Sequence, residues 1–542
     1  MERMSGSDAL LWHMEQPDRP VHTLKILVLD PRRRGRPISI DEVAAAVGPR
    51  LGIVKRATQK VVAAKGFRGI PFWVDDPDFE LRLHLDERTL PVPGTARDLD
   101  ALYSELAMSP LPRDRALWAM TLVHGLEDGH QAIVVRVHHA LTDGLGALNA
   151  FLASTTDSPG SVVPDQPAET AAPVSEADLR AEARRRFRKH VGAIPRLVRD
   201  ALAGHHKAKA FRATHRDLPP FIGSARNFCN AASGKDRLCA TASLPLDEMK
   251  SVARAAGVTL NGVLHGLLAG AMRVELQARG EVTSKPTAAA FAIAADSSDR
   301  SRRWGNAITP TNVGIFSNLD DPRERLAHTA RSCREGIELR RLTGVDMAER
   351  WANYGPRLVS LFLRTMADRS PWIVNHLTTG NVAGPSSRRW LGDIEVVDWY
   401  SFALALNPAN VNVTVHSYDG RMNFGLVTTP QAMPDPHLFL DRVAAELTLL
   451  SAVTSEAASP LMGPSNLVGS ERSRSKPPIP GSGSRPSHDH AHAAVNGDGD
   501  ATATTPRRLS DFVRSGNSDP SSRRELVLVD QRSEPVDPER WG

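Results

Sequence analysis

Residues 133–144 of the chain read IVVRVHHALTDG. The first five of these residues are mostly β-branched, which is typical of a short β-strand. The residues after this stretch carry apolar side chains at three- and four-residue spacing, as on one face of a helix: Leu145, Leu148 and Leu152. Thr142 or Asp143 can cap that helix. The sequence therefore predicts a strand–loop–helix corner, where a side chain can leave a sheet and face a cleft.

His138 and His139 close the predicted strand and point to opposite faces, so at most one of them faces a given cleft. A histidine suits proton transfer because its pKa lies near working pH. Held in a cleft, it can take the proton of a hydroxyl group as the oxygen attacks. We interpret His139 as this general base and His138 as a structural residue bonded into the protein body. Gly144 has no side chain, so it lets a substrate or a backbone pass close to the imidazole.

Asp143 has two interpretations. In the first, it contacts His139 directly, as the third member of a triad would. Alternatively, it turns away to cap the helix or to pair with an arginine, and so holds the loop in shape. We favour the second interpretation, because aspartates at helix starts are so often caps. Taken alone, HHxxxDG is a moderate signal, and its alternative is a pair of core histidines beside a turn.

Outward from this corner, composition divides the chain into segments. The length of 542 residues suggests two to four domains. The predicted segments are an N-terminal domain at residues 1–154, a linker with a basic amphipathic crossover helix at 155–220, a second domain at 221–457 and a mostly disordered tail at 458–542. The linker and the tail are rich in Pro, Ser and Asp, whereas both domains carry periodic apolar residues.

Both predicted domains mix strands with helices. The expected strands are residues 23–29, 133–137, 240–244, 288–295, 411–415 and 422–427. The expected helices are residues 40–51, 260–277 and 436–450, besides the one after Asp143. Tyr418, Asp419 and Gly420 mark a hairpin turn between the last two strands.

The linker contains a basic stretch at residues 180–199, with RRRFRK at positions 184–189. Its apolar side chains lie at helical spacing: Phe187, Val191, Ile194 and Val198. One interpretation is a helix that lies on an anionic membrane surface. The other is a crossover helix packed on the body with a solvated basic face. The second interpretation is at least as well supported, because both kinds of helix share this pattern.

Composition limits the compartment and the partners. The net charge of +5 favours anionic partners, such as nucleotide phosphates or acidic lipids, and no nucleic-acid-binding signature is present. Cys229, Cys239 and Cys333 are an odd number without C-x-x-C spacing, which argues against a disulfide framework and a zinc site and fits a reducing cytoplasm. The N-terminus lacks a signal-peptide layout, and no apolar run reaches ~18 residues. We therefore expect a cytoplasmic protein without a metal site or a membrane-spanning helix.

Matches spread along the chain carry a resemblance to a known family. In the first half they are SDALLW at 7–12, PFWVDDPDF at 71–79, LPVPG at 90–94, ALW at 116–118 and HHALTDG at 138–144. In the second half they are ATASLPL at 240–246, NVAGP at 381–385 and SYDG at 417–420. The chain resembles the bacterial wax ester synthase/diacylglycerol acyltransferase family. That family lies within the CoA-dependent acyltransferase superfamily, with chloramphenicol acetyltransferase and peptide-synthetase condensation domains.

The resemblance implies an α+β fold of two chloramphenicol-acetyltransferase-like sandwich domains around a central tunnel. It also implies that acyl-CoA is a substrate, with no bound cofactor, and that diacylglycerol or a long-chain alcohol accepts the acyl group. His139 would be the general base, and the product triacylglycerol or wax ester. The expected location is the cytoplasm, peripherally at the inner membrane or at lipid droplets. The alternatives are acyl transfer to another alcohol or amine, and a non-catalytic homologue that binds lipid.

Two positions depart from the family pattern. The family's Pro-Leu-Trp is Ala116-Leu117-Trp118 here, and we interpret Trp118 as a packing residue. The family's Asn-Asp pair is Asn261-Gly262. If the aspartate helps to hold the active site or the domain interface, this enzyme is slow, altered in specificity or inactive. Asn261 remains available as a hydrogen-bond donor or a helix cap, and we favour the cap.

Overall fold

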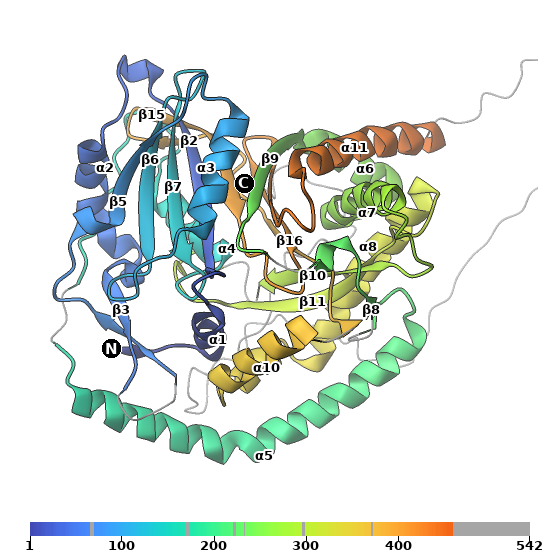
Figure 1. The fold of residues 1–542 in the computed structure, drawn as a ribbon, viewed down its shortest axis with the longest axis horizontal. Helices are drawn as coiled ribbons and strands as arrows, with labels where there is room; N and C mark the ends of the chain where they lie inside the picture. The colour runs from blue at the N-terminus through green and yellow to red at the C-terminus, as the bar shows by residue number, and fades with distance from the viewer. Residues whose placement is uncertain are drawn as a thin grey trace, which may run out of the picture. The chain divides into compact units, whose positions relative to one another are not determined.

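The computed structural model describes residues 1–64, 70–169, 173–220, 224–231, 234–294, 299–369 and 372–458. Figure 1 shows their helices and strands. The tail predicted at residues 458–542 lies outside the described residues, apart from its first residue, which ends the last helix.

The first sheet is built around two predicted strands, which are β2 (His22–Asp30) and β7 (Gln131–His138). It has six strands in the order β14-β15-β2-β7-β6-β5. The other members are β14 (Arg389–Leu391), β15 (Ile394–Phe402), β6 (Trp118–His124) and β5 (Leu85–Thr89). β5 pairs with β6 in parallel, and the remaining neighbours are antiparallel. The strand that ends at the histidines therefore lies inside the sheet.

Helices cover both faces of this sheet, because successive side chains of a strand point to opposite faces. Ile26 of β2 belongs to the core beneath α3 (Ala96–Met108). Leu29, on the other face, packs in the core with α2 (Ile40–Val47) and α4 (Gly144–Ser154). The helix predicted at residues 40–51 ends at Val47, because Gly48 and Pro49 follow and the chain continues as a 3-10 turn.

The second sheet has six strands in the order β11-β10-β13-β16-β17-β9. Their bounds are β11 (Ile308–Ile315), β10 (Thr287–Ala294), β13 (Leu377–Val382), β16 (Val411–Tyr418), β17 (Arg421–Thr428) and β9 (Leu238–Pro245). The four strands predicted from the second half are β9, β10, β16 and β17. The predicted hairpin turn has positive φ angles at Asp419 (44°) and Gly420 (77°), as tight hairpins require.

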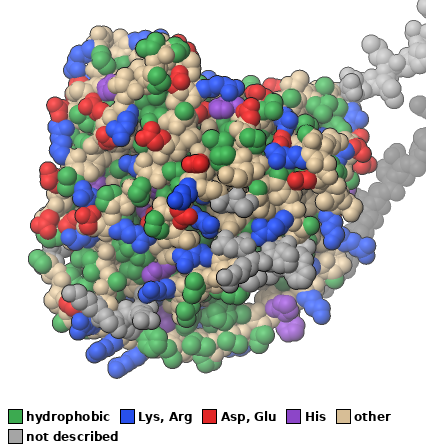
Figure 2. All heavy atoms as spheres, in the orientation of Figure 1, with side chains coloured by type: hydrophobic (Ala, Val, Ile, Leu, Met, Phe, Trp, Pro, Cys, Tyr) green, Lys and Arg blue, Asp and Glu red, His purple; other side chains and the backbone are tan. Residues whose placement is uncertain are grey.

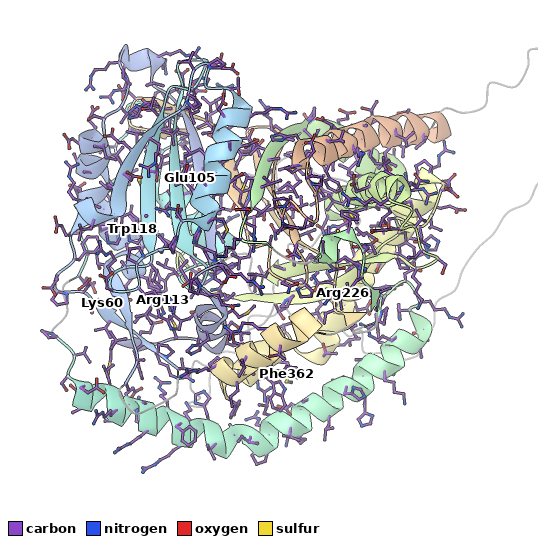
Figure 3. All side chains as sticks on the ribbon, viewed as in Figure 1. Lys60, Glu105, Arg113, Trp118, Arg226 and Phe362 are labelled. Carbon is purple, nitrogen blue, oxygen red and sulfur yellow. The ribbon has the colours of Figure 1, made fainter. Side chains whose placement is uncertain are left out.

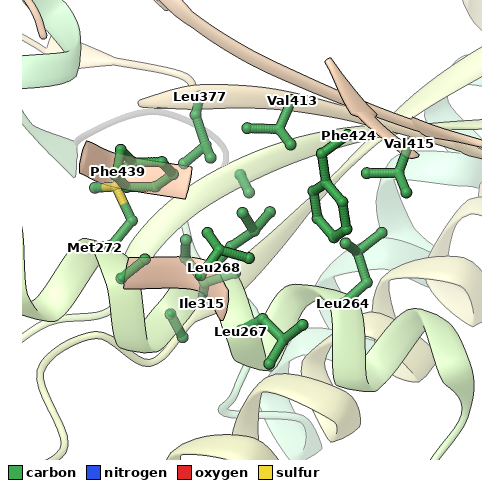
Figure 4. Packing of buried hydrophobic residues seen from close by; sticks show 14 of the residues in the cluster. Leu264, Leu267, Leu268, Met272, Ile315, Leu377, Val413, Val415, Phe424 and Phe439 are labelled. Atoms are coloured by element: carbon green, nitrogen blue, oxygen red, sulfur yellow. The ribbon is translucent and has the colours of Figure 1, made fainter. Parts of the chain in front are cut away.

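Four helices cover the second sheet: α6 (Leu246–Ala256), α7 (Leu260–Ala278), α8 (Pro322–Thr343) and α11 (Pro436–Ala458). Figure 4 labels side chains of this core, among them Leu264, Leu267, Leu268 and Met272 of α7 and Val413, Val415 and Phe424 of the sheet. No single described helix is long and apolar enough to cross a membrane, although α6 and α7, bent by 98°, meet the length and composition criteria as a pair.

β14 and β15 come from the second half of the chain but complete the first sheet. β15 pairs with β2 from Phe402–Leu24 to Glu395–Asp30. It also touches the second sheet, because the Asn423 side chain of β17 donates to the Trp399 carbonyl (3.0 Å). Residues 389–402, which the sequence placed in a separate second domain, thus belong to the first sheet. Hydrophobic periodicity predicts a strand but not its partners, so it could not reveal this exchange.

The linker forms one long helix, α5 (Glu176–Thr214), which contains the predicted basic stretch. In Figure 1 it runs along the lower edge of the view, below α10 (Pro356–Arg369). α10 packs on α1 (Gly6–Met14), which also contacts α9 (Met347–Ala352). The smaller strands are β1 (Glu2–Arg3), β4 (Phe72–Asp75) and β3 (Gln59–Val62) in one sheet, and β8 (Ser224–Ala225) with β12 (Trp372–Ile373) in another.

Candidate active site

His139 follows β7 directly, at the predicted corner. Its backbone N–H donates to the Val21 carbonyl (2.8 Å), and its carbonyl accepts from Asn306 Nδ2 (2.6 Å). One hydrogen bond thus ties the loop to Val21, which directly precedes β2. The other ties it to Asn306 in the second half of the chain. Burial is the main reason that the pKa of the imidazole is lowered, and the charge of Lys25 acts in the same direction. The site therefore favours a neutral imidazole, the form that can accept a proton.

His138 points away from His139 and is buried inside the first half. Its Nδ1 accepts from the Ala140 N–H (3.0 Å), and its Nε2 lies 3.7 Å from Glu15 Oε1. Its ring packs at a tilt against Trp12, with 5.8 Å between the ring centroids. Burial holds its pKa well below the usual range. These contacts fit the structural role expected for His138.

Asp143 caps α4 and clamps the loop. One carboxylate oxygen accepts from the Gly146 N–H (2.8 Å) and from Arg302 Nη2 (3.0 Å). The other oxygen accepts from the Ala307 N–H (2.9 Å). Of the two alternatives for Asp143, the geometry corresponds to the second, in which the carboxylate serves as a cap and pairs with an arginine. Arg302 is the arginine, a partner that the sequence did not identify.

A second buried hydrogen-bond network connects the same loop to α1. Asp8 of α1 accepts from the Asn306 side chain (2.7 Å) and from Arg56 (3.2 Å). Asn306 in turn holds the His139 carbonyl, so α1 reaches the catalytic corner through one amide. Asp8, Arg56 and Asn306, together with Arg302, line a cavity of about 630 Å³. Of these residues, only Asp8 was singled out from the sequence, as part of the SDALLW match. A single sequence does not show which residues so far apart are in contact.

Gly144 opens α4 where the second sheet comes close. A Cβ at this position would lie 3.2 Å from Cγ2 of Val382, at the end of β13. The neighbour that passes close to this glycine is therefore a side chain of the other sheet. Gly144 thus permits the contact between the two sheets beside the His139 loop.

Trp118 begins β6 and is a packing residue, as expected (Figure 3). Its Nε1 donates to the Ala57 carbonyl (2.8 Å), and its ring stacks on His84 at 4.5 Å between centroids. With Ala116 and Leu117 it is buried in the core beneath the loop. Ala116, which replaces the family proline, is thus buried in this core.

The predicted cap role of Asn261 is wrong. Thr259 caps α7, because its hydroxyl accepts from the Gly262 N–H (3.1 Å), while the Asn261 carbonyl meets His265 Nδ1 (2.8 Å). Asn261 therefore lies inside the first turn rather than before it. Gly262 faces α8, and a Cβ there would lie 2.8 Å from Cβ of Ala330.

The described residues contain no group of three or more His, Cys, Asp or Glu side chains placed to hold a metal ion. Cys229, Cys239 and Cys333 are free and buried. Burial raises the pKa of each of these thiols, to about 12 for Cys333, so none is an activated nucleophile at neutral pH.

The arrangement of two sheets is also found in solved structures. A wax ester synthase/diacylglycerol acyltransferase from Marinobacter aquaeolei VT8 shares the fold with a TM-score of 0.61 and 20% identity, over 84% of this chain and 100% of that one. The starter condensation domain of rhizomide synthetase matches with a TM-score of 0.52 and 12% identity, over 85% of this chain and 95% of that domain. The fold is therefore the one that this wax ester synthase/diacylglycerol acyltransferase shares with condensation domains, as predicted.

The family is defined by two matches that together span most of the chain. Residues 4–264 match the wax ester synthase/diacylglycerol acyltransferase catalytic domain, and residues 304–451 match the C-terminal domain of the same family. A candidate diacylglycerol O-acyltransferase of Mycobacterium tuberculosis is 29% identical over 81% of this chain and 93% of its own length. A second one from that species is 28% identical over 85% and 99%. The chain belongs to the wax ester synthase/diacylglycerol acyltransferase family and is an O-acyltransferase of this type, as the resemblance implied.

Proposed function

We propose that this enzyme transfers a long-chain acyl group from acyl-CoA to the hydroxyl group of diacylglycerol or of a long-chain alcohol, with His139 as the general base. The observation that carries the proposal is the double anchoring of the His139 backbone, to Val21 and to Asn306. A base must be held at a fixed position to act efficiently. Asp143 fixes the rest of the loop through Arg302 and Ala307.

The reaction proceeds by attack of the acceptor oxygen on the thioester carbonyl carbon. As the C–O bond forms, the hydroxyl proton moves to His139 and the carbonyl electrons move onto the carbonyl oxygen. The tetrahedral intermediate then collapses, the C–S bond breaks, and the leaving thiolate takes the proton from His139. The products are triacylglycerol or wax ester and free CoA, and the histidine returns to its neutral form.

The lowered pKa of His139 gives this mechanism a pH signature. A neutral imidazole is needed at the start of each turnover, so the acid limb of kcat/KM should lie below the usual histidine pKa of about 6.5. A pH titration of initial rates measures this limb. An acid limb above pH ~6.5 would contradict a buried neutral base at this position.

The proposed function is tested with labelled long-chain acyl-CoA and either diacylglycerol or hexadecanol. We expect neutral-lipid product from the wild type, and roughly a 10²–10⁴-fold lower kcat in His139→Ala. Circular dichroism of the variant controls for folding. A folded wild type that forms no product with any acceptor would refute the enzymatic proposal and favour the non-catalytic lipid-binding alternative.

We further propose that the enzyme works at an anionic phospholipid surface on the cytoplasmic side, through α5 and α10. Large apolar side chains are exposed along both helices: Phe187, Val191, Ile194, Val198 and Leu202 on α5, and Leu358, Val359, Leu361, Phe362 and Leu363 on α10. Figure 2 shows hydrophobic side chains gathered with Lys and Arg at its lower edge, where Figure 1 places the two helices, and Figure 3 labels Phe362. α5 carries eleven Arg and Lys against four Asp and Glu.

This surface combines the two features of an interfacial helix pair. Apolar side chains can enter the headgroup region, while basic side chains attract anionic lipids at about 1 kcal/mol per residue. Two hydrogen bonds connect α5 to the segment that leads into α10. Tyr354 donates to the His190 carbonyl of α5 (2.8 Å), and Arg350 of α9 donates to Asp200 of α5 (2.9 Å). Acyl acceptors such as diacylglycerol reside in such a surface.

Vesicle flotation tests the surface, using phosphatidylcholine with and without phosphatidylglycerol. We expect binding to the anionic vesicles that weakens with salt and in Arg184→Ala/Arg188→Ala and Leu358→Ser/Phe362→Ser. Leu449→Ser, which alters an exposed apolar residue on α11, is the matched control and should bind like the wild type. Equal binding by all variants would refute this surface.

A further inference from the structure

Lys25 is a buried lysine in the middle of β2. It lies between Val135 of β7 and Ser401 of β15 in the sheet, and only 8% of its surface is exposed. Its Nζ donates to the hydroxyl of the fully buried Ser401 (2.5 Å). Among the described residues no carboxylate forms an ion pair with this ammonium group. A buried charge held by one neutral hydrogen bond is costly to a fold, which suggests a role in function.

The Lys25 side chain lies on the face of the first sheet that carries His139. Side chains alternate along strands, so Val135, Val137 and the next odd position, His139, share one face of β7. Lys25 is opposite Val135 in the register and lies on the same face. Its charge is near enough to lower the pKa of His139, and Asp143 is near enough to influence Lys25.

His416 of β16 brings a further polar side chain to this region from the second sheet. It is fully buried, and neither of its ring nitrogens has a hydrogen-bond partner in the described structure. It is opposite Val382, the residue whose side chain meets Gly144. The contact of Val382 with Gly144 places this end of β16 near the start of α4, and the charge of Lys25 contributes to the lowered pKa of His416.

Buried donors and acceptors without partners are rare in folded proteins and call for an explanation. Both ring nitrogens of His416 and Nδ1 of His139 are such groups. The Lys25 ammonium, which can donate three hydrogen bonds, has only the Ser401 hydroxyl as a partner within the described part of the chain. Unused hydrogen-bonding capacity on both sides of one buried region fits a polar ligand that enters it. Within the proposed function, the polar part of the substrate is the thioester carbonyl with the acceptor hydroxyl.

We propose that Lys25 is a further catalytic residue, whose ammonium group, positioned by Ser401, binds the thioester carbonyl oxygen and stabilises the oxyanion. This inference rests on the proposed function. When the acceptor oxygen attacks, the carbonyl electrons move onto this oxygen and its negative charge meets the ammonium of Lys25. The charge returns to the carbonyl as the C–S bond breaks. Lys25 keeps its proton throughout, and His139 alone carries the transferred proton.

The acid–base behaviour of Lys25 gives the proposal a readout separate from a structural role. Burial lowers its pKa to about 8, and Asp143 opposes this shift. The charged and titratable groups that interact with it are His139, which follows β7, Asp143, which precedes α4, and His416 of β16. Activity should therefore fall as pH rises through about 8, where the ammonium loses its charge. In Lys25→Arg this basic limb should move to higher pH, because a guanidinium stays charged.

The decisive experiment compares Lys25→Met and Lys25→Arg with Lys60→Met. Lys60 of β3, which lies outside the site (Figure 3), is the matched control. Its ammonium group pairs with Asp76 (2.7 Å). In Lys25→Met we expect kcat to fall by roughly 10²–10³-fold, as for other oxyanion donors, with little change in KM. The melting temperature should stay equal or rise, because an uncompensated buried charge is removed.

Two results would overturn the role of Lys25. One is a Lys25→Met variant that keeps wild-type kcat, and the other is a variant whose melting temperature falls together with its activity. If this variant does not fold, Ser401→Ala tests the same idea, since it frees the ammonium and should lower kcat and shift the basic limb. An inactive wild type would instead refute the proposed function, so the two failures are distinguishable.

Discussion

The first turns of α4 and α7 begin in the same way and serve different ends. Each helix has a capping side chain, Asp143 in α4 and Thr259 in α7, that accepts from a backbone N–H three residues later. Asp143 also binds Arg302 and the Ala307 N–H, 159 and 164 residues away. Among the described residues, the Thr259 side chain makes only this local cap, and its helix turns Gly262 towards Ala330 of α8.

A helix cap therefore becomes part of an active site through its distant partners. Asp143 joins the catalytic loop to the second half, so its loss changes the position of His139. At Gly262 a side chain would collide with Ala330, so the glycine belongs to the contact between α7 and α8. The glycine that replaces the family aspartate thus allows α7 and α8 to pack closely at this position. The His139 loop is held by other residues, namely Asn306, Arg302 and Ala307.

The largest effect is expected from Asp143→Ala. The substitution leaves the half-buried Arg302 and two N–H groups without their partner, so the free energy of unfolding should fall by about 3–5 kcal/mol. Displacement of the loop should also lower kcat by about 10²-fold. Urea unfolding and initial rates measure both effects. Asp143→Asn, which keeps a capping oxygen, should lose less stability, and an equal loss would refute the capping contribution.

A smaller loss is expected from Gly262→Asp, which restores the family residue. The new Cβ meets Ala330 at 2.8 Å, so overpacking should cost about 1–3 kcal/mol of unfolding free energy without raising kcat. An aspartate here would also complete a capping box with Thr259, which offsets part of the cost. Ala330→Gly in the same chain should restore stability. Higher activity in Gly262→Asp would show instead that the aspartate serves the site.

Thr259→Ala isolates the local cap. We expect a loss of about 1 kcal/mol in the free energy of unfolding, because one N–H at the start of α7 loses its acceptor. The value of kcat should stay at the wild-type level, measured with the same acyl-CoA assay. A drop in kcat comparable to that of Asp143→Ala would remove the distinction between the two helix starts.

The smallest effect is expected from Asn261→Ala. The side chain of Asn261 makes no hydrogen bond to the described residues, and its carbonyl, which meets His265, is unchanged by the substitution. The free energy of unfolding should change by less than about 0.5 kcal/mol. A change in kcat without a change in stability would assign Asn261 a contact with substrate.

The catalytic corner was largely predictable because its signals are local. β-branched residues gave β7, leucine spacing gave α4, and the preference of aspartate for helix starts gave the cap. The strand alternation also separated His138 from His139. The Asn261 prediction failed by two positions, since threonine and asparagine are both good caps and the helix begins at Leu260.

The remaining parts depend on contacts between distant residues, which one sequence does not contain. Asp8 meets Asn306 across 298 positions, and Asn306 meets His139 across 167. β15 leaves the second half to pair with β2 for the same reason. The exposed apolar side of α10 was not foreseen either, because an amphipathic helix is normally assigned an apolar face toward a core.

The central claim is that His139, on a loop clamped by Asp143, is the base of acyl transfer. The most direct measurement is the single-turnover rate of ester formation by His139→Ala, with Thr259→Ala as a control of similar or lower stability. We predict a rate at least ~100-fold below that of the wild type for His139→Ala, and a wild-type rate for the control. A folded His139→Ala enzyme whose rate stays within a few-fold of the wild type would contradict the claim.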